Sequence, residues 1–561
     1  MVSFGRDALF VRVKPSGPHR YLQIAENYRE GPKVKQKVLC TLGRLDELCA
    51  SGKVDALAQS LLRFGSRLKV LDLHRAGAVR VETDVSIGPA LVFGRLWREL
   101  GIAEVIEQAL ADRHFAFDVE RAVFLTVLHR LMDPGSDRAA EKWKQDFRIP
   151  GAEPIELHQL YRAMGWLGQP TGPEPTHDVP ELGVRTTKDR IEELLFARRR
   201  DLFSSLSVLF FDTTSIYFEG EGGQRIGQLG HSKDGRPDLK QMVMGAALDE
   251  RGRPVACELL PGNATDVKLF FPAIKALQNR FAAGSFCVVA DRGMIRQATL
   301  QALEAPGSGI EYILGCRMRR NKEVRDEVLA ADEELVQEVC FDRQASREPL
   351  VLELREVRIE DRRYVVCFNP EQAKKDAADR QAIVESLREK LKQGDKALVG
   401  NKGYRKYLKR EGAQAVFSID EEKLEEEARY DGLWVLRTNT RLSVEEVAFQ
   451  YKQLWMVEQA FRAVKSVLET RPIYHKCDDT IRGHVFCSFL ALVLMKELLS
   501  RLEAAGKNLE WEDIKRDLTA LREVEIAMED KDRYFLRTEL RGCCFEVLKA
   551  AGVAVPPTLR R

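Results

Sequence analysis

One acidic residue interrupts the most strongly strand-like stretch of the chain. Residues 207–218, SVLFFDTTSIYF, surround Asp212 with apolar side chains, and residues 208–211 and 216–218 each have the composition of a β-strand. An isolated ionised carboxylate in an apolar interior costs several kcal/mol or more. Asp212 must therefore be paired with a cation, coordinated to a metal ion, or located at an exposed strand end. Taken alone, a salt-bridged structural aspartate is the simplest of these explanations.

Two further acidic residues lie in or next to segments with an apolar pattern. The apolar strand SFCVVAD ends in Asp291, and Glu458 lies in YKQLWMVEQAFRAVKSVLETRP, which predicts a helix from Tyr451. The apolar residues of that helix recur at spacings of three and four and predict a buried face: Leu454, Val457, Phe461, Val464 and Leu468. Spacings of seven predict that Tyr451, Glu458 and Lys465 form one polar stripe. A solvated helix face would show the same pattern.

The order of the predicted elements indicates an α/β protein of several domains. A strand, a hairpin, a helix and further strands after residue 207 indicate a mixed sheet. Helical patterns precede it, and a Pro-rich connection is predicted at 168–183. The predicted regions are a basic β-rich module (1–80), a helical region (85–205), a core in two parts (207–315 and 433–500), an insertion (316–432) and a C-terminal helical region (501–561).

Composition places few further limits on the chain. Hydrophobic residues make up 44% and charged residues 31% of the 561 residues, which is typical of a globular protein. We expect a cytoplasmic protein, because no apolar run has the length of a membrane helix or the form of a signal peptide. The 11 cysteines are scattered without a C-x-x-C pair, so they are expected to be reduced.

Charge is distributed unevenly along the chain. The net charge is +2, whereas residues 1–80 contain 15 Lys or Arg against 7 Asp or Glu. A basic β-rich module commonly follows a phosphate backbone. A basic edge that protects strands from aggregation would have the same composition. Both interpretations stay open.

The three acidic residues are best considered together. One lies within a strand, one at the end of a later strand, and one on a helix that follows the insertion. Carboxylates from several elements can converge on a pair of Mg²⁺ ions, because hard cations prefer oxygen ligands. Such a pair activates water or a 3′-hydroxyl toward a phosphodiester.

Six segments between residues 207 and 475 carry a family resemblance: FFDTTSIYFEG, GHSKDGRPDLKQMVMG, LLPGNATD, VVADRGM, DGLWVLRTN and YKQLWMVEQAFRAVKS. In this order they resemble the DDE transposases of bacterial insertion sequences, in the broad insertion-sequence-four group. The resemblance implies an RNase H-like core interrupted by a β-rich insertion, with Asp212, Asp291 and Glu458 as the catalytic and metal-binding triad. The signature Y-x2-R-x3-E-x6-K of that group matches at Tyr451, Glu458 and Lys465, whereas Leu454 stands where arginine is expected.

The resemblance also implies contacts with DNA, and makes the helical region 85–205 a DNA-binding region. Tyr451 and Lys465 would bind phosphate, and Arg462 is a candidate replacement for the missing arginine, although it could equally pair with Glu458. Arg292 is a further candidate, or alternatively a strand-end charge. The remaining candidates lie on the loop GQLGHSKDGRPDLKQ: His231, Lys233, Arg236 and Lys240.

The implied activity is Mg²⁺-dependent cleavage at insertion-sequence ends followed by strand transfer of the 3′-hydroxyl into target DNA, with two Mg²⁺ ions for which Mn²⁺ can substitute. The implied partners are double-stranded DNA, as terminal inverted repeats and target, and a second copy of the chain in the DNA complex. No membrane partner is expected, and the location would be the bacterial nucleoid. Two alternatives remain, namely an RNase H-like nuclease or resolvase without strand transfer and a non-catalytic DNA-binding regulator.

Overall fold

The computed structural model describes residues 9–30, 33–62, 79–172, 184–199, 207–281, 286–294, 296–331, 337–341, 350–392, 404–411, 416–528 and 533–560. Most of the predicted Pro-rich connection lies outside these ranges. The chain forms two compact units. The first comprises residues 1–84, 522–539 and 556–561, and the second comprises residues 85–521 and 540–555.

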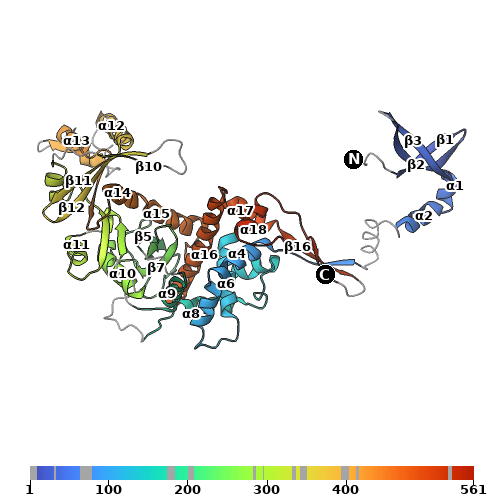
Figure 1. Cartoon of the computed structure of the whole chain (residues 1–561), viewed down its shortest axis with the longest axis horizontal. Helices are drawn as coiled ribbons and strands as arrows, with labels where there is room; N and C mark the ends of the chain where they lie inside the picture. Colours follow the sequence, from blue (N-terminus) through green and yellow to red (C-terminus); the bar gives the residue numbers. More distant parts are fainter. Residues whose placement is uncertain are drawn as a thin grey trace. The chain divides into compact units, whose positions relative to one another are not determined.

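A mixed sheet forms the centre of the second unit (Figure 1). Its first five strands in the chain are β5 (Val208–Tyr217), β6 (Gln241–Leu248), β7 (Pro254–Pro261), β8 (Phe286–Ala290) and β9 (Ile310–Gly315). They lie in the order β7-β6-β5-β8-β9, with β5, β6 and β7 antiparallel and with β8 parallel to both β5 and β9. This arrangement confirms the predicted RNase H-like mixed sheet.

Strand β5 is continuous through Asp212. This confirms the prediction that Asp212 lies within a strand, because Asp212 pairs with Ala246 of β6 in an unbroken ladder. The polar residues after it, Thr213 to Ser215, are buried and belong to the same strand. β-branched threonines fit a pleated strand, and backbone pairing satisfies their peptide groups.

The two faces of the sheet contact different helices. Leu209 and Phe211 of β5 belong to a buried cluster with residues of α10 (Asp266–Arg280) and α11 (Gln297–Leu303). Phe210, one residue away, belongs to the cluster of the opposite face. That face is covered by α14 (Val444–Lys452), α15 (Trp455–Arg462) and α16 (Asp478–Ala504). Because side chains alternate along a strand, Asp212 projects on the same face as Phe210.

The helical region packs directly on the core. Its helices are α4 (Gly88–Glu99), α5 (Ile102–Ala109), α6 (Val119–Met132), α7 (Asp137–Trp143), α8 (Leu157–Gly168) and α9 (Thr187–Arg199). Helices α6 and α8 contact α16 (Figure 1). A Cβ atom on Gly483 would lie 1.9 Å from the carbonyl oxygen of Met164, so glycine allows the backbones of α8 and α16 to touch. The helical region and the core therefore form one compact unit.

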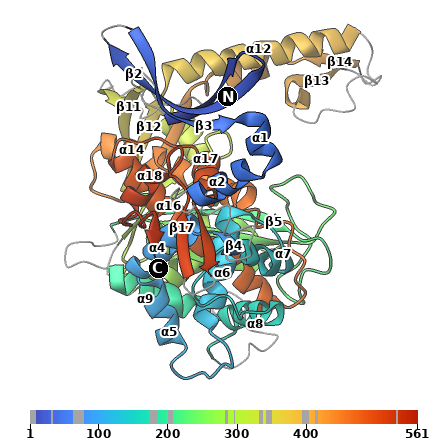
Figure 2. The same ribbon diagram turned by 90° about the vertical axis from the view of Figure 1, so that its right-hand side faces the viewer.

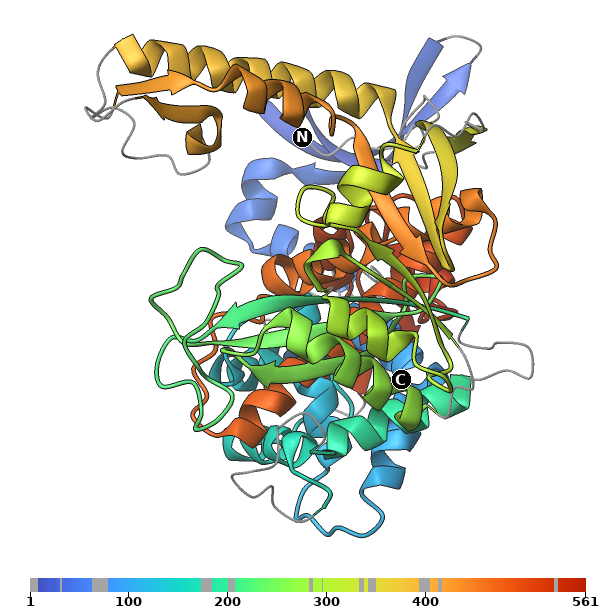
Figure 3. The ribbon, with the colours of Figure 1, turned by 90° about the vertical axis from the view of Figure 1, so that its left-hand side faces the viewer.

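The insertion extends the core sheet. Strands β10 (Gln337–Phe341), β11 (Leu350–Ile359) and β12 (Arg362–Phe368) continue it through β15 (Leu433–Thr438), which pairs with both β12 and β9. The long helix α12 (Pro370–Lys392) contacts β14 (Val416–Ile419), which pairs with β13 (Leu408–Glu411) (Figure 3). Helix α13 (Glu421–Ala428) then leads into β15. The strands of the insertion thus return the chain to the edge of the core.

The first unit contains two small sheets. Strands β1 (Leu9–Ser16), β2 (His19–Glu30) and β3 (Lys33–Arg44) form an antiparallel sheet followed by α1 (Leu45–Ala50) and α2 (Lys53–Leu62) (Figure 2). The second sheet has the order β18-β17-β16-β4. Its strands are β4 (Val79–Ser86), β16 (Arg522–Met528), β17 (Arg533–Arg537) and β18 (Leu559–Arg560).

The prediction of a helical C-terminal region was therefore only partly correct. The described part of residues 501–561 contains α17 (Trp511–Thr519) and α18 (Cys544–Ala550), but also the strands β16, β17 and β18. None of the described helices combines the length and the apolar composition needed to span a membrane.

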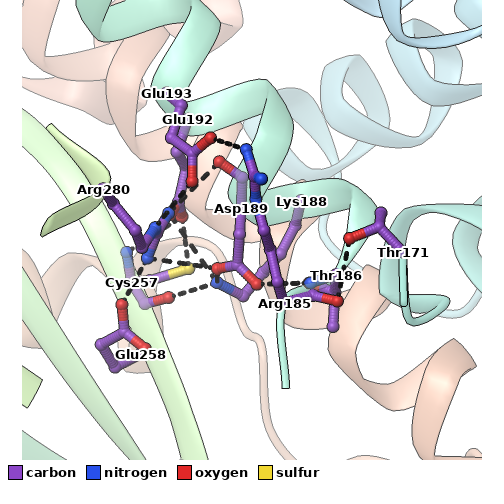
Figure 4. Close-up of polar contacts among 10 residues, drawn as sticks. All are labelled: Thr171, Arg185, Thr186, Lys188, Asp189, Glu192, Glu193, Cys257, Glu258 and Arg280. Atoms are coloured by element: carbon purple, nitrogen blue, oxygen red, sulfur yellow. Dashed lines mark hydrogen bonds and ion pairs between the residues drawn. The ribbon is translucent and has the colours of Figure 1, made fainter. Parts of the chain in front are cut away.

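A buried ionic cluster attaches α9 to β7 and α10 (Figure 4). Arg280 lies 3.2 Å from Asp189, 2.5 Å from Glu192 and 2.5 Å from Glu258. Lys188 lies 2.5 Å from Asp189 and also donates to the carbonyl of Cys257. Burial opposes the charge of Lys188, but the neighbouring carboxylates nevertheless raise its pKa. Burial raises the pKa of Glu258 to about 7.

Replacing Arg280 with methionine should destabilise the second unit by about 3–5 kcal/mol, because Asp189 and Glu192 would then share only Lys188 and Glu258 would lose its ion pair. Urea unfolding followed by circular dichroism measures the change. Arg325→Met is the matched control, because Arg325 pairs with Asp326 on the surface and should leave the transition midpoint unchanged. Equal stability of the two variants would show that the cluster does not attach α9.

Candidate active site

Strand pairing places two of the three acidic residues side by side. Strands β5 and β8 run parallel, with Phe210 opposite Val289. Asp212 lies two residues after Phe210, and Asp291 lies two residues after Val289, so this register places the two acidic residues side by side. Neighbouring strands are about 5 Å apart. Both carboxylates project on the face covered by α14 and α15, because Phe210 and Val289 belong to the cluster of that face.

Helix α15 brings the third carboxylate to the same place. The helix contacts β5 and β6 and buries Val457, Ala460 and Phe461 against the core, whereas Glu458 is exposed. The three acidic residues line one cavity of about 270 Å³. Its other lining residues are Trp434, Tyr451, Lys452, Leu454 and Trp455. The structure thus brings together the whole predicted triad.

The helix that was predicted from Tyr451 is broken. Helix α14 ends at Lys452, and α15 begins at Trp455. The turns after it, Ala463–Val467, are a π-helix. Tyr451 and Glu458 are therefore on different helices, and the prediction of one polar stripe through Tyr451, Glu458 and Lys465 was wrong.

Tyr451 reaches the site by a different route. Its hydroxyl donates a hydrogen bond to Oδ1 of Asp291 over 3.0 Å. Burial and the Asp291 carboxylate raise the pKa of Tyr451, so the hydroxyl keeps its proton at neutral pH. A Cβ atom on Gly315 would lie 2.3 Å from this hydroxyl oxygen. Glycine at the end of β9 is therefore needed for Tyr451 to lie against Asp291.

Backbone contacts fix the positions of both aspartates. The N–H of Thr213 donates to Oδ1 of Asp212 over 2.7 Å. Arg317 donates to the carbonyls of Arg292 and Gly293, over 3.0 and 2.8 Å, and so fixes the turn that follows Asp291. Sequence reasoning missed Arg317, because it lies in the insertion and matches no recognised motif.

The predicted DNA contacts occupy different environments. Lys233 donates from its ammonium group to the carbonyl and hydroxyl of Thr213, next to Asp212. Lys465 forms a 2.7 Å ion pair with Asp234, and burial lowers its pKa. The ammonium group of Lys240 donates to the carbonyl of Glu221, and Arg236 pairs with Asp238.

Three other candidates are exposed: His231, Arg292 and Arg462. Arg462 is not among the residues that line the cavity, so its geometry does not single it out as the replacement for the signature arginine. Leu454 is half-buried, contacts the core and also lines the cavity. The prediction that it packs inward is therefore only partly correct, because the side chain also faces the carboxylates.

The donor set of the cavity fits a hard divalent cation. Three carboxylates from β5, the end of β8 and α15 face one solvent-connected space, and Mg²⁺ and Mn²⁺ prefer oxygen ligands of this kind. Asp137, His475 and His484 form another group with ligand atoms within 4.8 Å of one another. There, however, the guanidinium of Arg130 lies 2.8 Å from Nδ1 of His484, so that nitrogen is already bound by a cation.

Comparison with known families agrees with this site. Residues 204–494 match the model of the transposase DDE domain, and residues 11–73 match the N-terminal domain of IS1634 family transposases. The chain therefore belongs to the DDE transposases of insertion sequences. The match to the DDE domain contains the first part of the core, most of the second part and all three acidic residues.

A solved structure shows a distant similarity. The piggyBac transposase in its synaptic complex with hairpin DNA matches 77% of this chain and 79% of its own, with 9% identity and a TM-score of 0.36. No curated protein matches the chain. The likeness to piggyBac is too weak to assign any residue of the cavity.

Replacing Gly315 with alanine should displace Tyr451 from Asp291 and destabilise the protein by about 1–3 kcal/mol, because the added methyl group overpacks the site. Thermal unfolding measures the loss. Gly94→Ala is the control, since its Cβ would meet its nearest neighbour at an ordinary 3.7 Å. Wild-type stability of Gly315→Ala would contradict the close packing of Tyr451 against β9.

Proposed function

We propose that this transposase cuts DNA at the ends of its insertion sequence and joins the freed 3′-hydroxyl to target DNA, with two Mg²⁺ ions bound by Asp212, Asp291 and Glu458. Mn²⁺ would substitute for Mg²⁺. The observation that supports this function is the cavity lined by all three carboxylates, which come from strand β5, the residue after strand β8 and helix α15 of an RNase H-like core. Membership of the DDE family agrees with it.

The reaction consists of two displacements at phosphorus. In cleavage, a water oxygen attacks the phosphodiester, the bond to the 3′-oxygen breaks, and that oxygen takes up a proton. In strand transfer, this 3′-hydroxyl attacks a target phosphodiester and displaces the 3′-oxygen of the target, so the number of phosphodiester bonds is unchanged. The bound metal ions would activate the attacking oxygen and stabilise the leaving oxygen.

The residues around the cavity have supporting roles in this proposal. Tyr451 holds Asp291 through its hydroxyl, and Lys233 holds the strand at Thr213, next to Asp212. Arg292, His231, Arg236, Lys240 and Arg462 are exposed and would contact the DNA backbone. Lys465 would bind a phosphate near the cavity.

The remaining regions would bind DNA ends. The basic module of residues 1–80 contains the segment that matches the N-terminal domain of IS1634 transposases. The helical region 85–205 follows this module in the sequence and packs on the core. The substrates would be the terminal inverted repeats and target DNA, bound by a homodimer. The nucleoid is the corresponding location for a protein with this substrate.

The central test is cleavage by variants of the triad. Asp212→Asn, Asp291→Asn and Glu458→Gln should each reduce Mg²⁺-dependent cleavage of DNA flanking the protein's own gene by at least about 10³-fold, because a metal ligand is lost while little volume changes. Glu311→Gln, at an exposed position on β9, should cleave like the wild type. The cut ends are mapped on sequencing gels, and joined products are counted in a plasmid target.

The possible results distinguish the proposed function from its alternatives. Substantial cleavage by any triad variant would remove that residue from the site. Cleavage by the wild-type protein without joined products would identify a nuclease or resolvase. Specific binding without any cleavage would identify a DNA-binding regulator.

Deleting residues 1–62, which contain the sheet β1–β3 and the helices α1 and α2, should weaken binding to terminal DNA and reduce its dependence on salt. The cause would be the loss of phosphate contacts from the basic module. Fluorescence anisotropy with a labelled duplex measures both quantities. The assignment would be wrong if the shortened chain bound terminal DNA as tightly and as specifically as the full chain.

A further inference from the structure

A buried carboxylate on the loop that follows β5 is shared by two cations. Asp234 lies on the loop between β5 and β6, and its side chain is only 9% exposed. Nζ of Lys465 lies 2.7 Å from Oδ1 of Asp234, and Nη1 of Arg471 lies 2.6 Å from Oδ2. The side chains of Lys465 and Arg471 are 12% and 25% exposed. Since one carboxylate faces two cations, this cluster retains one surplus positive charge.

Local contacts attach Asp234 to the strand that carries Asp212. The hydroxyl of Ser232 accepts hydrogen bonds from the backbone N–H groups of Asp234 and Arg236, which fixes the turn of the loop at Asp234. The preceding residue, Lys233, binds Ser215 through its backbone and Thr213 through its ammonium group. The loop is thus hydrogen-bonded to β5 at Thr213, the residue after Asp212.

The two cations belong to the segment that follows Glu458. Lys465 lies in the π-helical turns directly after α15, and Arg471 follows six residues later. Asp234 therefore joins the strand of the first acidic residue to the segment that follows the third. Arg471 also lies over the ring of Tyr217, a β5 residue, at 5.5 Å.

Both cations keep hydrogen-bond donors for another anion. Within the described part of the chain, Arg471 forms one ion pair, through Nη1, whereas a guanidinium has five N–H donors. Lys465 forms one ion pair, and an ammonium group has three donors. Partly buried cations with a surplus charge and spare donors suit a phosphate oxygen, which arginine and lysine bind by charge-assisted hydrogen bonds.

We propose that Lys465 and Arg471 together bind one backbone phosphate of the DNA strand beside the cavity, that Asp234 orients them, and that Arg471 supplies the cation missing at Leu454. This inference rests on the proposed transposase function. It assigns a ligand-binding role to Arg471 and a positioning role to Asp234, neither of which belongs to the signature that matches at Tyr451, Glu458 and Lys465.

The salt dependence of DNA binding tests this assignment in the full-length protein. The probe is a labelled duplex from the DNA that flanks the protein's own gene, and affinity is measured at several salt concentrations. Arg471→Ala should lower the slope of log K against log[salt] by about 0.9, which corresponds to one phosphate contact, whereas Arg471→Lys should keep the wild-type slope. Arg501→Ala is the control, because Arg501 is also 25% exposed but pairs with two carboxylates, Glu99 and Glu497.

The variant Asp234→Asn separates the positioning of the two cations from their binding to DNA. Both cations remain in this variant, so the salt slope should not fall. The cleavage rate at saturating DNA should nevertheless decrease by about tenfold, because the cations lose their orientation. If the ion pairs of Asp234 had only a structural role, their loss in this variant would lower the melting temperature and leave the cleavage rate of the folded fraction unchanged.

The inference is overturned if folded Arg471→Ala shows the wild-type slope, or if Asp234→Asn cleaves at the wild-type rate. If Arg471→Ala does not fold, Arg471→Gln, which keeps most of the volume without the charge, must show the reduced slope. A wild-type chain that neither binds nor cuts the probe would instead contradict the proposed function. The two failures are therefore distinguishable.

Discussion

The parallel pairing of β5 with β8 is the constraint on which the site depends. It brings Asp212 and Asp291 to the same level of adjacent strands, on the same face of the sheet. Two like charges separated by about the spacing between neighbouring strands repel each other by about 1–3 kcal/mol, depending on how strongly water screens them. The strands cannot separate to relieve this repulsion without breaking the backbone pairing of β5 with β8. Divalent cations between the carboxylates would offset the cost, and this would explain why an apolar strand contains an aspartate.

The insertion explains how an acidic residue about 170 positions later in the chain joins this pair. Its strands extend the core sheet, and β15 pairs with β9 at the edge of the core. The chain then crosses one face of the sheet as α14 and α15. The break between these helices turns Leu454 toward the cavity and lets Tyr451 contact Asp291 from one helix while Glu458 approaches from the next.

The sequence was informative where a local pattern is tied to one structural outcome. The apolar runs around Asp212 and before Asp291 predicted the strands, and the buried face of Val457, Phe461 and Val464 predicted the side of α15 that packs on the core. The triad itself was predicted from the resemblance and from three acidic residues on three separate elements. These signals depend on burial and periodicity, which a single sequence records.

Other features depend on contacts between distant segments. Periodicity could not reveal the turn at Gln453 and Leu454, since the apolar spacing continues through it. The pairing of Lys465 with Asp234 joins residues 231 positions apart, and Arg471 lies beyond the recognised signature. Near the C-terminus, β16 lies next to β4 (Val79–Ser86) in the sheet, and no local pattern in the sequence indicates this pairing. Each of these outcomes was decided by tertiary packing rather than by local propensity.

The most direct measurement of the central claim is anomalous scattering from crystals of the protein soaked in Mn²⁺. Mn²⁺ prefers the same oxygen ligands as Mg²⁺ and can be located without reference to activity. The account predicts anomalous peaks in the cavity, within about 2.0–2.4 Å of carboxylate oxygens of Asp212, Asp291 and Glu458. Crystals that bind Mn²⁺ elsewhere, with no peak in this cavity, would contradict the assignment of these three residues as metal ligands.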